Sequence, residues 1–594
     1  MKKIILLAIA AYFLIAPFTY HPDTKLTLRY PALENNKVWD IYGYINGHKL
    51  DIPDFHYPPA HYWWLKIHYP ISKIVGGKGF TEWLSSGSAQ ASFDQNVLRY
   101  NLAAKLPLLI LGLVSGWLIF LIVKKATNSE VKAKKAALFW YFNPVTLFSL
   151  VIMGQNDIVA IFLFLMGIVF YKRWWLVALF WGLASGVKSY PIIWSVMFLL
   201  AWEKNIIKLI LKIGSVIGIY VLILLPWLGK SYFTESVLNS GLSQRMFIAN
   251  IPIGFDKQIL IIPLFLIIIG LNTWKNKSVN KMAIACLAIF QSCLIILGFS
   301  HFNPQWMLWT IPFLSIWWFI VGINKTDLLA LLIILVVWVG LILGFDDKFL
   351  TWGLFTPINP NLINFPSLVE FIKNKGIDIS GIINLSQSVL AGIALWFLTK
   401  KIKIKKDQNK DFKIKNWFVF IPCFLIIFTI SVCLIFKVEN KTYSQMSNEK
   451  IYLKEISGYK WSYENENNLK YFEVFLDNAG LNSQDKGILV VTDEYNNKLE
   501  KEFSGFNAGV NSWLRVDIPQ EMSNSKTLYV ETKDIVIKDG LLKVGLDNNG
   551  RWAINFYNSE RLSTVDIFNK LFNFWWWWLM IAGVIIFYIK IKKD

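Results

Sequence analysis

The stretch that decides the fold is "WYFNPVTLFSLVIMGQNDIVAIFLFLMGI", residues 140–168. It contains two apolar runs separated by the polar residues Gln155, Asn156 and Asp157, which directly follow Gly154. Glycine followed by polar residues is a turn signal, so we expect the chain to reverse direction there between two apolar helices. Polar side chains at such a junction are costly unless they face protein or water, which makes function the first hypothesis. The alternative is that Asn156 and Asp157 cap the following helix.

Apolar runs of this kind recur along most of the chain. Of the 594 residues, 55% are hydrophobic and 17% are charged, and 28 are tryptophan. This is the composition of a membrane protein rather than of one soluble core. About fourteen runs reach the roughly 17 to 25 residues that a helix needs to cross a bilayer. We therefore expect a polytopic α-helical membrane protein with about 13 to 14 transmembrane helices.

The first apolar run, residues 3–18, follows the basic start "MKK" and has two interpretations. It could be a secretory signal that is removed, or a helix that stays in the chain. No clear A-x-A cleavage site follows it, which favours an uncleaved first helix.

Basic residues predict the orientation of the chain. If the N-terminus is cytoplasmic, the basic loops at residues 124–135, 171–173, 272–281 and 400–415 all lie inside, as the positive-inside rule requires. The C-terminus is then also cytoplasmic, in a multi-pass protein of the cell membrane. The formal net charge of +20 is explained by this topology, and no nucleic-acid partner is expected. Abundant Lys, Asn and Ile suggest a bacterial plasma membrane.

The C-terminal part of the chain has a different pattern. Residues 438–570 alternate apolar and polar side chains in segments such as "KYFEVFLDN", "GILVVTDEY" and "TLYVET", separated by turn signals such as "DNNG". We predict a small extracytoplasmic β-sandwich of jelly-roll type here. Residues 571–594 then form a last transmembrane helix with a basic cytoplasmic tail. Residues 1–437 form the multi-spanning domain.

Two further features of composition bear on ligands. Trp461, Trp513 and Trp552 could form a sugar-stacking face in the C-terminal part, although core tryptophans are at least as common. The four cysteines all lie inside apolar runs, so neither a disulfide framework nor a zinc cluster is expected. No cofactor is expected, and the use of a divalent metal stays open.

The first outside loop, residues 19–105, contains the candidate catalytic acid. Asp40 follows the first apolar run, and a carboxylate near the membrane face could accept a proton from a hydroxyl group. The alternative is a helix cap or a solvated loop acid, which is the commoner role of an isolated aspartate. Asp51 and Asp54 share this loop and are alternative acids. Candidates for positioning the loop or an acceptor are Tyr42, Tyr57 and His61.

Three cations follow at other outside helix junctions. Lys188 lies in "GLASGVKSYP", where the charge rule gives no reason for a lysine, and phosphate is a suitable partner for it. Snorkelling to the interface is the alternative role. Arg245 lies in an outside loop, and His301 opens "SHFNPQWMLW" beside amide side chains. An outward histidine can donate hydrogen bonds to phosphate or sugar oxygens, although a lone histidine is more often structural.

Together these segments resemble a known superfamily. The chain resembles the GT-C membrane glycosyltransferases in the order of its motifs. These are a first-loop Asp with a downstream "YPP", then "NP", "GQND", "GLASGVKSYP" and "SHFNPQWMLW". The resemblance is greatest to the polyprenyl-phosphate-dependent mannosyltransferases and covers roughly residues 1–345, where these motifs lie.

The resemblance implies an inverting transfer of a hexose, with mannose favoured, on the outer face of the membrane. The donor would be a polyprenyl-phosphate sugar, and the acceptor a hydroxyl of a lipid-linked or cell-surface glycan. By this resemblance Asp40 is the base. The residues that would bind the donor are Lys188, Arg245, His301, Gln155, Asn156 and Asp157. Because no second acid lies next to Asp40, as it does in the commoner pattern, Asp51 and Asp54 stay as alternatives.

Three other classes of function are compatible with parts of the sequence. A transporter or flippase would also have polar helix junctions, but we find no internal repeat or paired broken helices. A polymerase or ligase of lipid-linked glycans usually has an arginine-rich large outside loop, whereas this one offers chiefly Arg245. A binding or anchoring protein would explain the β-rich part but not the polar junctions.

Overall fold

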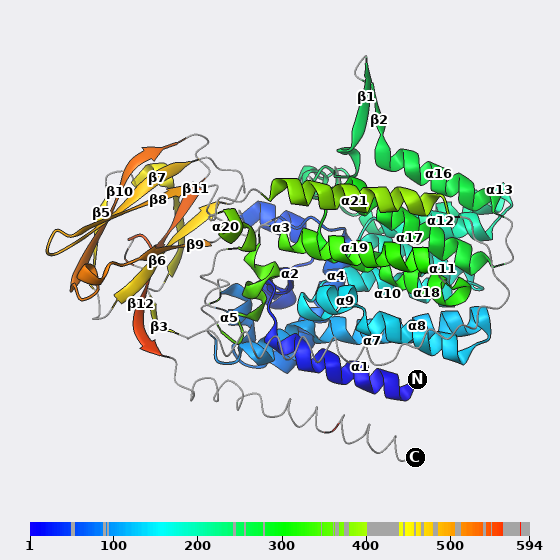
Figure 1. Cartoon of the computed structure of the whole chain (residues 1–594), viewed down its shortest axis with the longest axis horizontal. Coiled ribbons are helices and arrows are strands. Elements are labelled where there is room, and N and C mark those ends of the chain that lie inside the picture. The colour runs from blue at the N-terminus through cyan, green and yellow to red at the C-terminus, as the bar shows by residue number, and fades with distance from the viewer. Residues whose placement is uncertain are drawn as a thin grey trace. The chain divides into compact units, whose positions relative to one another are not determined.

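The structure is a computed structural model of the chain (Figure 1). It describes residues 1–48, 54–86, 91, 94–240, 245–254, 257–276, 280–322, 324–345, 347–359, 362, 367–373, 379–400, 439–443, 446–456, 459–464, 469–478, 485–504, 512–537, 542–547, 549, 551–561 and 583. The chain divides into two compact units. The first is mainly helical and contains Met1–Ile358 and Pro366–Ser431, and the second contains the sheets within Val432–Phe572.

Five described helices are long and apolar enough to cross a membrane: α7 (Val97–Thr127), α13 (Ile206–Leu224), α17 (Lys281–Phe299), α19 (Lys325–Leu343) and α21 (Ser380–Leu398). The number rises to seven if each of two bent helix pairs is counted as one span. Four shorter apolar helices are α10 (Asp157–Val169), α11 (Trp174–Val187), α12 (Pro191–Trp202) and α16 (Ile261–Lys275).

The first bent pair joins α1 (Lys2–Ile15) and the 3₁₀ turn η1 (Ala16–Phe18) to α2 (Pro22–Ala32), at an angle of 84°. The second joins α8 (Glu130–Phe142) to α9 (Pro144–Thr146) and the π-helix η3 (Leu147–Ile152), at 43°. The remaining helices of this unit are α3 (Ile41–His48), α4 (Pro59–Gly76), α5 (Phe80–Ser85), α14 (Ser231–Phe233), α18 (Ile311–Val321) and α20 (Leu368–Lys373).

The described residues thus contain fewer full-length apolar helices than the 13 to 14 that the sequence predicts. Where the sequence predicts several of these spans, the structure has one of the four short helices or a bent pair instead, because Pro and Gly interrupt the apolar runs. The helix predicted within 571–594 lies outside the described residues, apart from residue 583. α7 begins at Val97, so the last part of the predicted first loop is helical, and α2, α3, α4 and α5 occupy much of its remainder.

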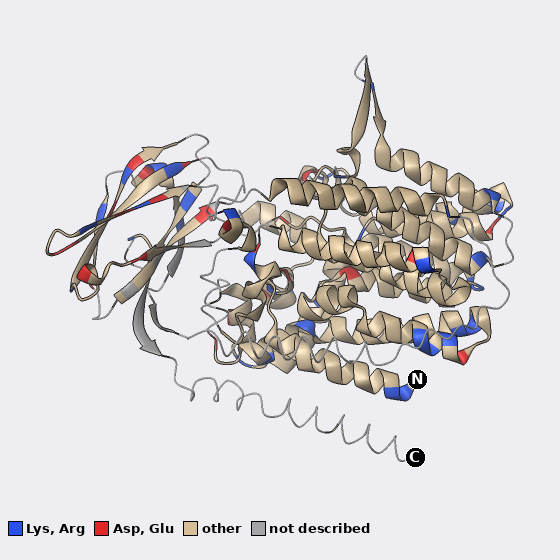
Figure 2. Cartoon of the chain, viewed as in Figure 1, with Lys and Arg blue, Asp and Glu red and all other residues tan. Residues whose placement is uncertain are grey.

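Burial separates the helices into inner and outer ones. α17 is almost wholly enclosed and packs against α12, α16, α18 and α21. By contrast, α13 leaves Ile207, Ile210, Leu211 and Leu222 exposed, and α19 does the same with Val336. Figure 2 shows that the charged residues of this unit lie mainly near helix ends, with few charged residues along the helices between them. A broad exposed apolar surface is typical of a protein that contacts lipid.

The second unit contains two antiparallel sheets. The four-stranded sheet has the order β5 (Lys460–Glu464), β10 (Thr527–Val536), β7 (Lys486–Asp493) and β8 (Lys498–Ser504). The six-stranded sheet has the order β3 (Glu439–Tyr443), β12 (Ile554–Arg561), β6 (Leu469–Asn478), β11 (Leu542–Asp547) and β4 (Met446–Tyr452), and β9 (Ser512–Asp517) also pairs with β6. A separate hairpin, β1 (Asn250–Gly254) with β2 (Lys257–Leu260), belongs to the helical unit.

Apolar side chains from both sheets form one shared core, to which Val474 contributes from β6 and Val491 from β7. The predicted alternating segments all coincide with strands of these sheets. Trp552 is fully buried, and its indole nitrogen donates a hydrogen bond to the carbonyl of Phe475 over 2.8 Å. Trp461 is 9% exposed and belongs to the same core. These two tryptophans are therefore core residues rather than a sugar-stacking face.

Candidate functional site

The break between α1 and α2 positions an aspartate that the sequence analysis did not single out. Pro22 begins α2, where its missing N–H and fixed φ suit the first helical position. His21 is the N-cap, and its ring accepts a hydrogen bond from the backbone N–H of Asp23 over 3.3 Å. Asp23 therefore lies in the first turn of α2, where the helix dipole favours a carboxylate.

A second break faces the first one. The chain turns at Gly154, between η3 and α10, as the sequence predicted. The φ angle of Gly154 is +69°, and a Cβ there would lie 2.7 Å from the hydroxyl oxygen of Thr24. That hydroxyl donates a hydrogen bond to the carbonyl of Met153 over 2.6 Å. Only glycine fits both the backbone conformation and the close approach of the two breaks.

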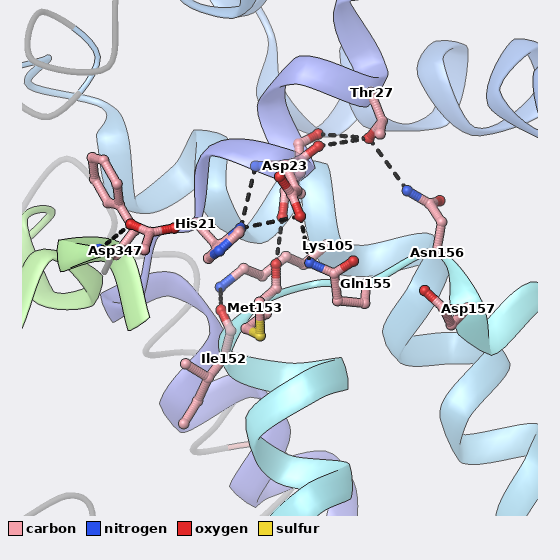
Figure 3. A network of polar contacts seen from close by, with 12 residues as sticks. His21, Asp23, Thr27, Lys105, Ile152, Met153, Gln155, Asn156, Asp157 and Asp347 are labelled. Carbon is pink, nitrogen blue, oxygen red and sulfur yellow. Dashed lines mark hydrogen bonds and ion pairs between the residues drawn. The ribbon is translucent and has the colours of Figure 1, made fainter. Parts of the chain in front are cut away.

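Lys105, on α7, lies between the two breaks and joins them (Figure 3). Its buried ammonium group donates hydrogen bonds to the carbonyls of Ala16 (3.0 Å), Thr19 (2.7 Å) and Ile152 (2.5 Å). The hydroxyl oxygen of Thr19 also lies 2.9 Å from this nitrogen. Among the described residues, no carboxylate lies within ion-pair distance of it. Lys105 thus satisfies main-chain oxygens that the breaks in α1 and η3 leave without partners.

The carboxylate of Asp23 is only partly engaged (Figure 3). Its Oδ2 accepts a hydrogen bond from the amide of Gln155 over 3.0 Å and lies 3.6 Å from Nδ1 of His21. No donor among the described residues contacts its Oδ1, and the side chain is 45% exposed. The neighbouring Asn156 donates to the hydroxyl of Thr27, which itself bonds the carbonyl of Asp23. A fixed carboxylate with one free, accessible oxygen can accept a proton or a hydrogen bond from a bound molecule.

Asp157 differs from Asp23, because all its surroundings are protein. Its side chain is 2% exposed and accepts hydrogen bonds from Trp309 (2.7 Å) and Tyr190 (3.4 Å). Lys188 forms an ion pair with it over 3.7 Å. The side chain makes no capping hydrogen bond at the start of α10, and neither does that of Asn156. The capping interpretation of these residues is therefore wrong, and Asp157 instead holds Lys188 in place.

Lys188 lies between α11 and α12, beside Asp157 and Tyr57. Burial lowers the pKa of Lys188, but the negative charge of Asp157 and smaller contributions from Tyr57 and Asp23 raise it above its ordinary value. The ammonium group is therefore charged at neutral pH and lies 4.1 Å from the ring centre of Tyr57. Asp23 accepts a hydrogen bond from Gln155, and Asp157, two residues further along the same turn, pairs with Lys188, so the exposed carboxylate and this cation lie at one helix junction.

Two other predicted residues extend the site. Tyr57 stacks on His61 with ring centres 4.4 Å apart. Burial and then the charge of Lys188 lower the pKa of His61 well below its ordinary value, so its imidazole is neutral. Its Nδ1 lies 3.3 Å from the carbonyl of Val187, next to Lys188. His61 and Tyr57 thus form a support for Lys188, which is a positioning role.

Arg245 is linked to Asp157 through two stacked tryptophans, because Trp306 beside it stacks on Trp309, which donates to Asp157. Arg245, in the 3₁₀ turn η5 (Arg245–Phe247), has its guanidinium 6.0 Å from the ring centre of Trp306. Its charge interacts with Tyr57, and it has no ion-pair partner among the described residues. Burial and the charge of Arg245 lower the pKa of His301, so that residue is neutral at pH 7 and offers hydrogen bonds rather than charge.

Asp40, the base predicted from the sequence, is fully occupied. Its Oδ1 accepts hydrogen bonds from Trp227 (2.8 Å) and the backbone N–H of Gly43 (3.1 Å). Its Oδ2 accepts from Tyr232 (3.1 Å) and Lys230 (3.3 Å). Partial burial raises the pKa of Asp40, but these four donors together lower it below its ordinary value. A carboxylate held in this way is a weak base, and the geometry favours a role in fixing α3 to residues 227–232.

The other loop residues lie apart from Asp23 or are not described. Tyr42 is buried beneath Asp40 and donates a hydrogen bond to the carbonyl of Tyr57 over 2.5 Å, which connects the two regions. Asp54 is exposed and lines a small hollow of about 70 Å³ together with Glu235. Asp51 lies outside the described residues.

The structure therefore brings together six of the predicted residues: Gln155, Asn156, Asp157, Lys188, Tyr57 and His61. Arg245 is linked to them through Trp306 and Trp309, and the charge of Arg245 acts on His301. The structure adds Asp23, Lys105 and Asp347. The carboxyl of Asp347 lies near His21 and Asp23, and burial raises its pKa above the ordinary value although His21 lowers it. The sequence signal for Asp23 was "HPD" directly after the first apolar run.

Among the described residues, no group of three His, Cys, Asp or Glu side chains is placed to hold a metal ion. Neither a protein-family model, nor a curated protein, nor a solved structure matches this chain.

Proposed function

We propose that the chain is a polytopic membrane glycosyltransferase of the GT-C type. It transfers a hexose, with mannose favoured, from a polyprenyl-phosphate donor to a hydroxyl of a lipid-linked or cell-surface glycan. The observation that supports this most is the half-exposed Asp23 carboxylate, with a free oxygen, which Gln155 joins to the turn where Asp157 holds the cation Lys188. An acid and a cation at helix breaks are the two groups that an inverting transfer from a phosphate needs.

In the proposed reaction Asp23, rather than Asp40, is the base. The free Oδ1 of Asp23 takes the proton of the acceptor hydroxyl, whose oxygen bonds to the anomeric carbon of the sugar. The bond between that carbon and the phosphate oxygen breaks on the opposite side, and polyprenyl phosphate leaves. Lys188 and Arg245 stabilise the negative charge that builds on the leaving phosphate, and the neutral His301 donates a hydrogen bond. No atoms other than those of donor and acceptor are consumed.

The same proposal gives each unit a location at the cell membrane. The exposed apolar faces of α13 and α19 contact lipid, both termini are cytoplasmic, and the site opens to the outer leaflet of the cell membrane. The donor reaches it sideways through the bilayer. The two facing sheets within residues 439–561 form an extracytoplasmic β-sandwich.

The test is sugar transfer by the purified full chain from a panel of polyprenyl-phosphate hexoses to lipid extracts of the host. The expected result is release of polyprenyl phosphate and labelling of one acceptor class with one donor. If no donor of the panel is consumed, the proposal fails and the polymerase or ligase alternative is preferred. Movement of an intact lipid-linked sugar between leaflets, without bond cleavage, would support a flippase instead.

Arg245→Gln tests the phosphate-binding role within the same assay. Removing a charge-assisted contact of about 1.5 to 3 kcal/mol should raise KM for the donor roughly 10- to 100-fold and change kcat less. Because Arg245 has no ion-pair partner among the described residues, the fold should be unaffected. Arg173→Gln, in the turn between α10 and α11, is the control and should leave KM unchanged. An unaltered donor KM in Arg245→Gln would remove this residue from the site.

A further inference from the structure

A second feature of the helical unit lies at the end of α7 opposite to Lys105. Here a cavity of about 840 Å³ lies between the last turn of α7, the turn after α10, the end of α12 and the start of α17. Lys105 and Lys124 are 19 residues apart on α7, which corresponds to about 29 Å of helix and matches the roughly 30 Å thickness of a bilayer core. The cavity and the candidate site therefore lie near opposite faces of the proposed membrane.

Three lysines line this cavity: Lys124, Lys125 and Lys281. Lys125 lies 4.6 Å from the ring centre of Tyr171, and Lys281 donates a hydrogen bond to the carbonyl of Trp202 over 3.2 Å. Among the described residues, no carboxylate is within ion-pair distance of any of the three, and none lines the cavity. The cavity is thus a concentration of positive charge with no carboxylate among the residues that line it.

The remaining walls are mainly apolar. Aliphatic side chains of α7 and α10, such as Ile168, line them together with Met282 and the rings of Tyr171 and Trp202. Asn128 and Asn280 add two uncharged polar side chains. Cationic pockets between helices on the basic side of a membrane protein suit the phosphate of a lipid headgroup, and aliphatic walls suit its chains. A free phosphate would gain only from the lysines.

We infer that this cavity binds the phosphate headgroup of an anionic phospholipid from the leaflet opposite to the candidate site. The inference depends on the membrane-spanning part of the proposed function and not on the transfer reaction. Each lysine near an anionic lipid contributes about 1 kcal/mol, so three of them predict roughly 100-fold selectivity for an anionic over a zwitterionic headgroup.

The test is lipid binding to the purified full chain, with phosphatidylglycerol and phosphatidylcholine as probes in native mass spectrometry and titration. The test variant replaces the three cavity lysines: Lys124→Gln, Lys125→Gln and Lys281→Gln. The charge-matched control replaces three exposed lysines that do not line the cavity: Lys132→Gln, Lys208→Gln and Lys325→Gln. We expect the selectivity for phosphatidylglycerol to persist in the control and to disappear in the test variant.

Three outcomes would overturn the inference. The first is unchanged selectivity in the cavity variant. The second is an equal loss of selectivity in the control, which would indicate an effect of general surface charge. The third is displacement of the lipid by glycerol phosphate at similar concentrations, which would indicate a soluble ligand. The assay contains no sugar donor, so it can fail while transfer succeeds. An Asp23→Asn chain should bind phosphatidylglycerol normally, which separates the two proposals.

Discussion

Asp23→Asn should lower the rate of sugar transfer by about 10²- to 10⁴-fold, the usual contribution of a general base. The amide has nearly the size of the carboxylate and its oxygen still accepts the hydrogen bond from Gln155, but it takes no proton from the acceptor. The loss should appear in kcat, with the donor KM nearly unchanged, because in the proposed reaction Asp23 contacts the acceptor hydroxyl rather than the donor phosphate. Steady-state kinetics with the best donor of the panel measure both.

Asp40→Asn is the matched control for this experiment. It removes the same charge from the same part of the chain, but at a carboxylate whose oxygens are taken by Trp227, Lys230 and other donors. We expect less than about a tenfold loss of activity, since one charge-assisted contact is weakened rather than a base removed. Loss of transfer in a folded Asp40→Asn chain, with activity kept in Asp23→Asn, would return the base to Asp40.

The comparison of Asp23 with Asp40 also shows which features of the site could be predicted from the sequence and which could not. Asp40 and Asp23 both follow the first apolar run, and nothing local distinguishes an occupied carboxylate from an open one. Two of the donors that occupy Asp40, Trp227 and Lys230, are almost two hundred residues away in sequence. Partners at such a distance depend on the packing of α3 against residues 227–232, which no local pattern encodes.

The cations were easier to predict, because their signal is local. Lys188 was recognised as a charge between two apolar helices on the side where the charge rule expects none. The structure places it against Asp157, at the other predicted polar junction. Both residues lie at junctions between apolar helices. Because successive apolar runs cross in alternating directions, the sequence alone places these two junctions on the same side of the helical unit.

The strands and long helices follow from periodicity, whereas the short and bent helices do not. β6 and β7 alternate apolar and polar residues and were predicted within a few residues. The bend between α1 and α2 depends instead on contacts with Lys105 of α7 and with Gly154 in the turn between η3 and α10. Counting apolar runs therefore overestimates the number of full spans, since a run that bends or stops short still passes a hydropathy criterion.

Substitution of Lys105 gives the second large prediction, because this side chain bonds main-chain carbonyls at both helix breaks, the one after α1 and the one after η3. In Lys105→Met, the carbonyls of Ala16, Thr19 and Ile152 lose a buried donor, at about 1 to 3 kcal/mol each. Part of this loss is offset because a buried ammonium group, which costs several kcal/mol to desolvate, is also removed. The net expected destabilisation is about 3 kcal/mol, which for a chain of this size should lower the unfolding temperature by about 2 to 4 °C.

Thermal unfolding of the purified chain in detergent, followed by tryptophan fluorescence at one fixed scan rate, measures this effect. Lys132→Met, at an exposed position on α8, is the control and should change the unfolding temperature by no more than about 1 °C. Because the two breaks carry Asp23 and Gln155, Lys105→Met should also lower kcat at temperatures where the chain is still folded. A variant that is as stable and as active as wild type would show that water or a main-chain shift replaces the lysine, and that Lys105 does not set the geometry of the site.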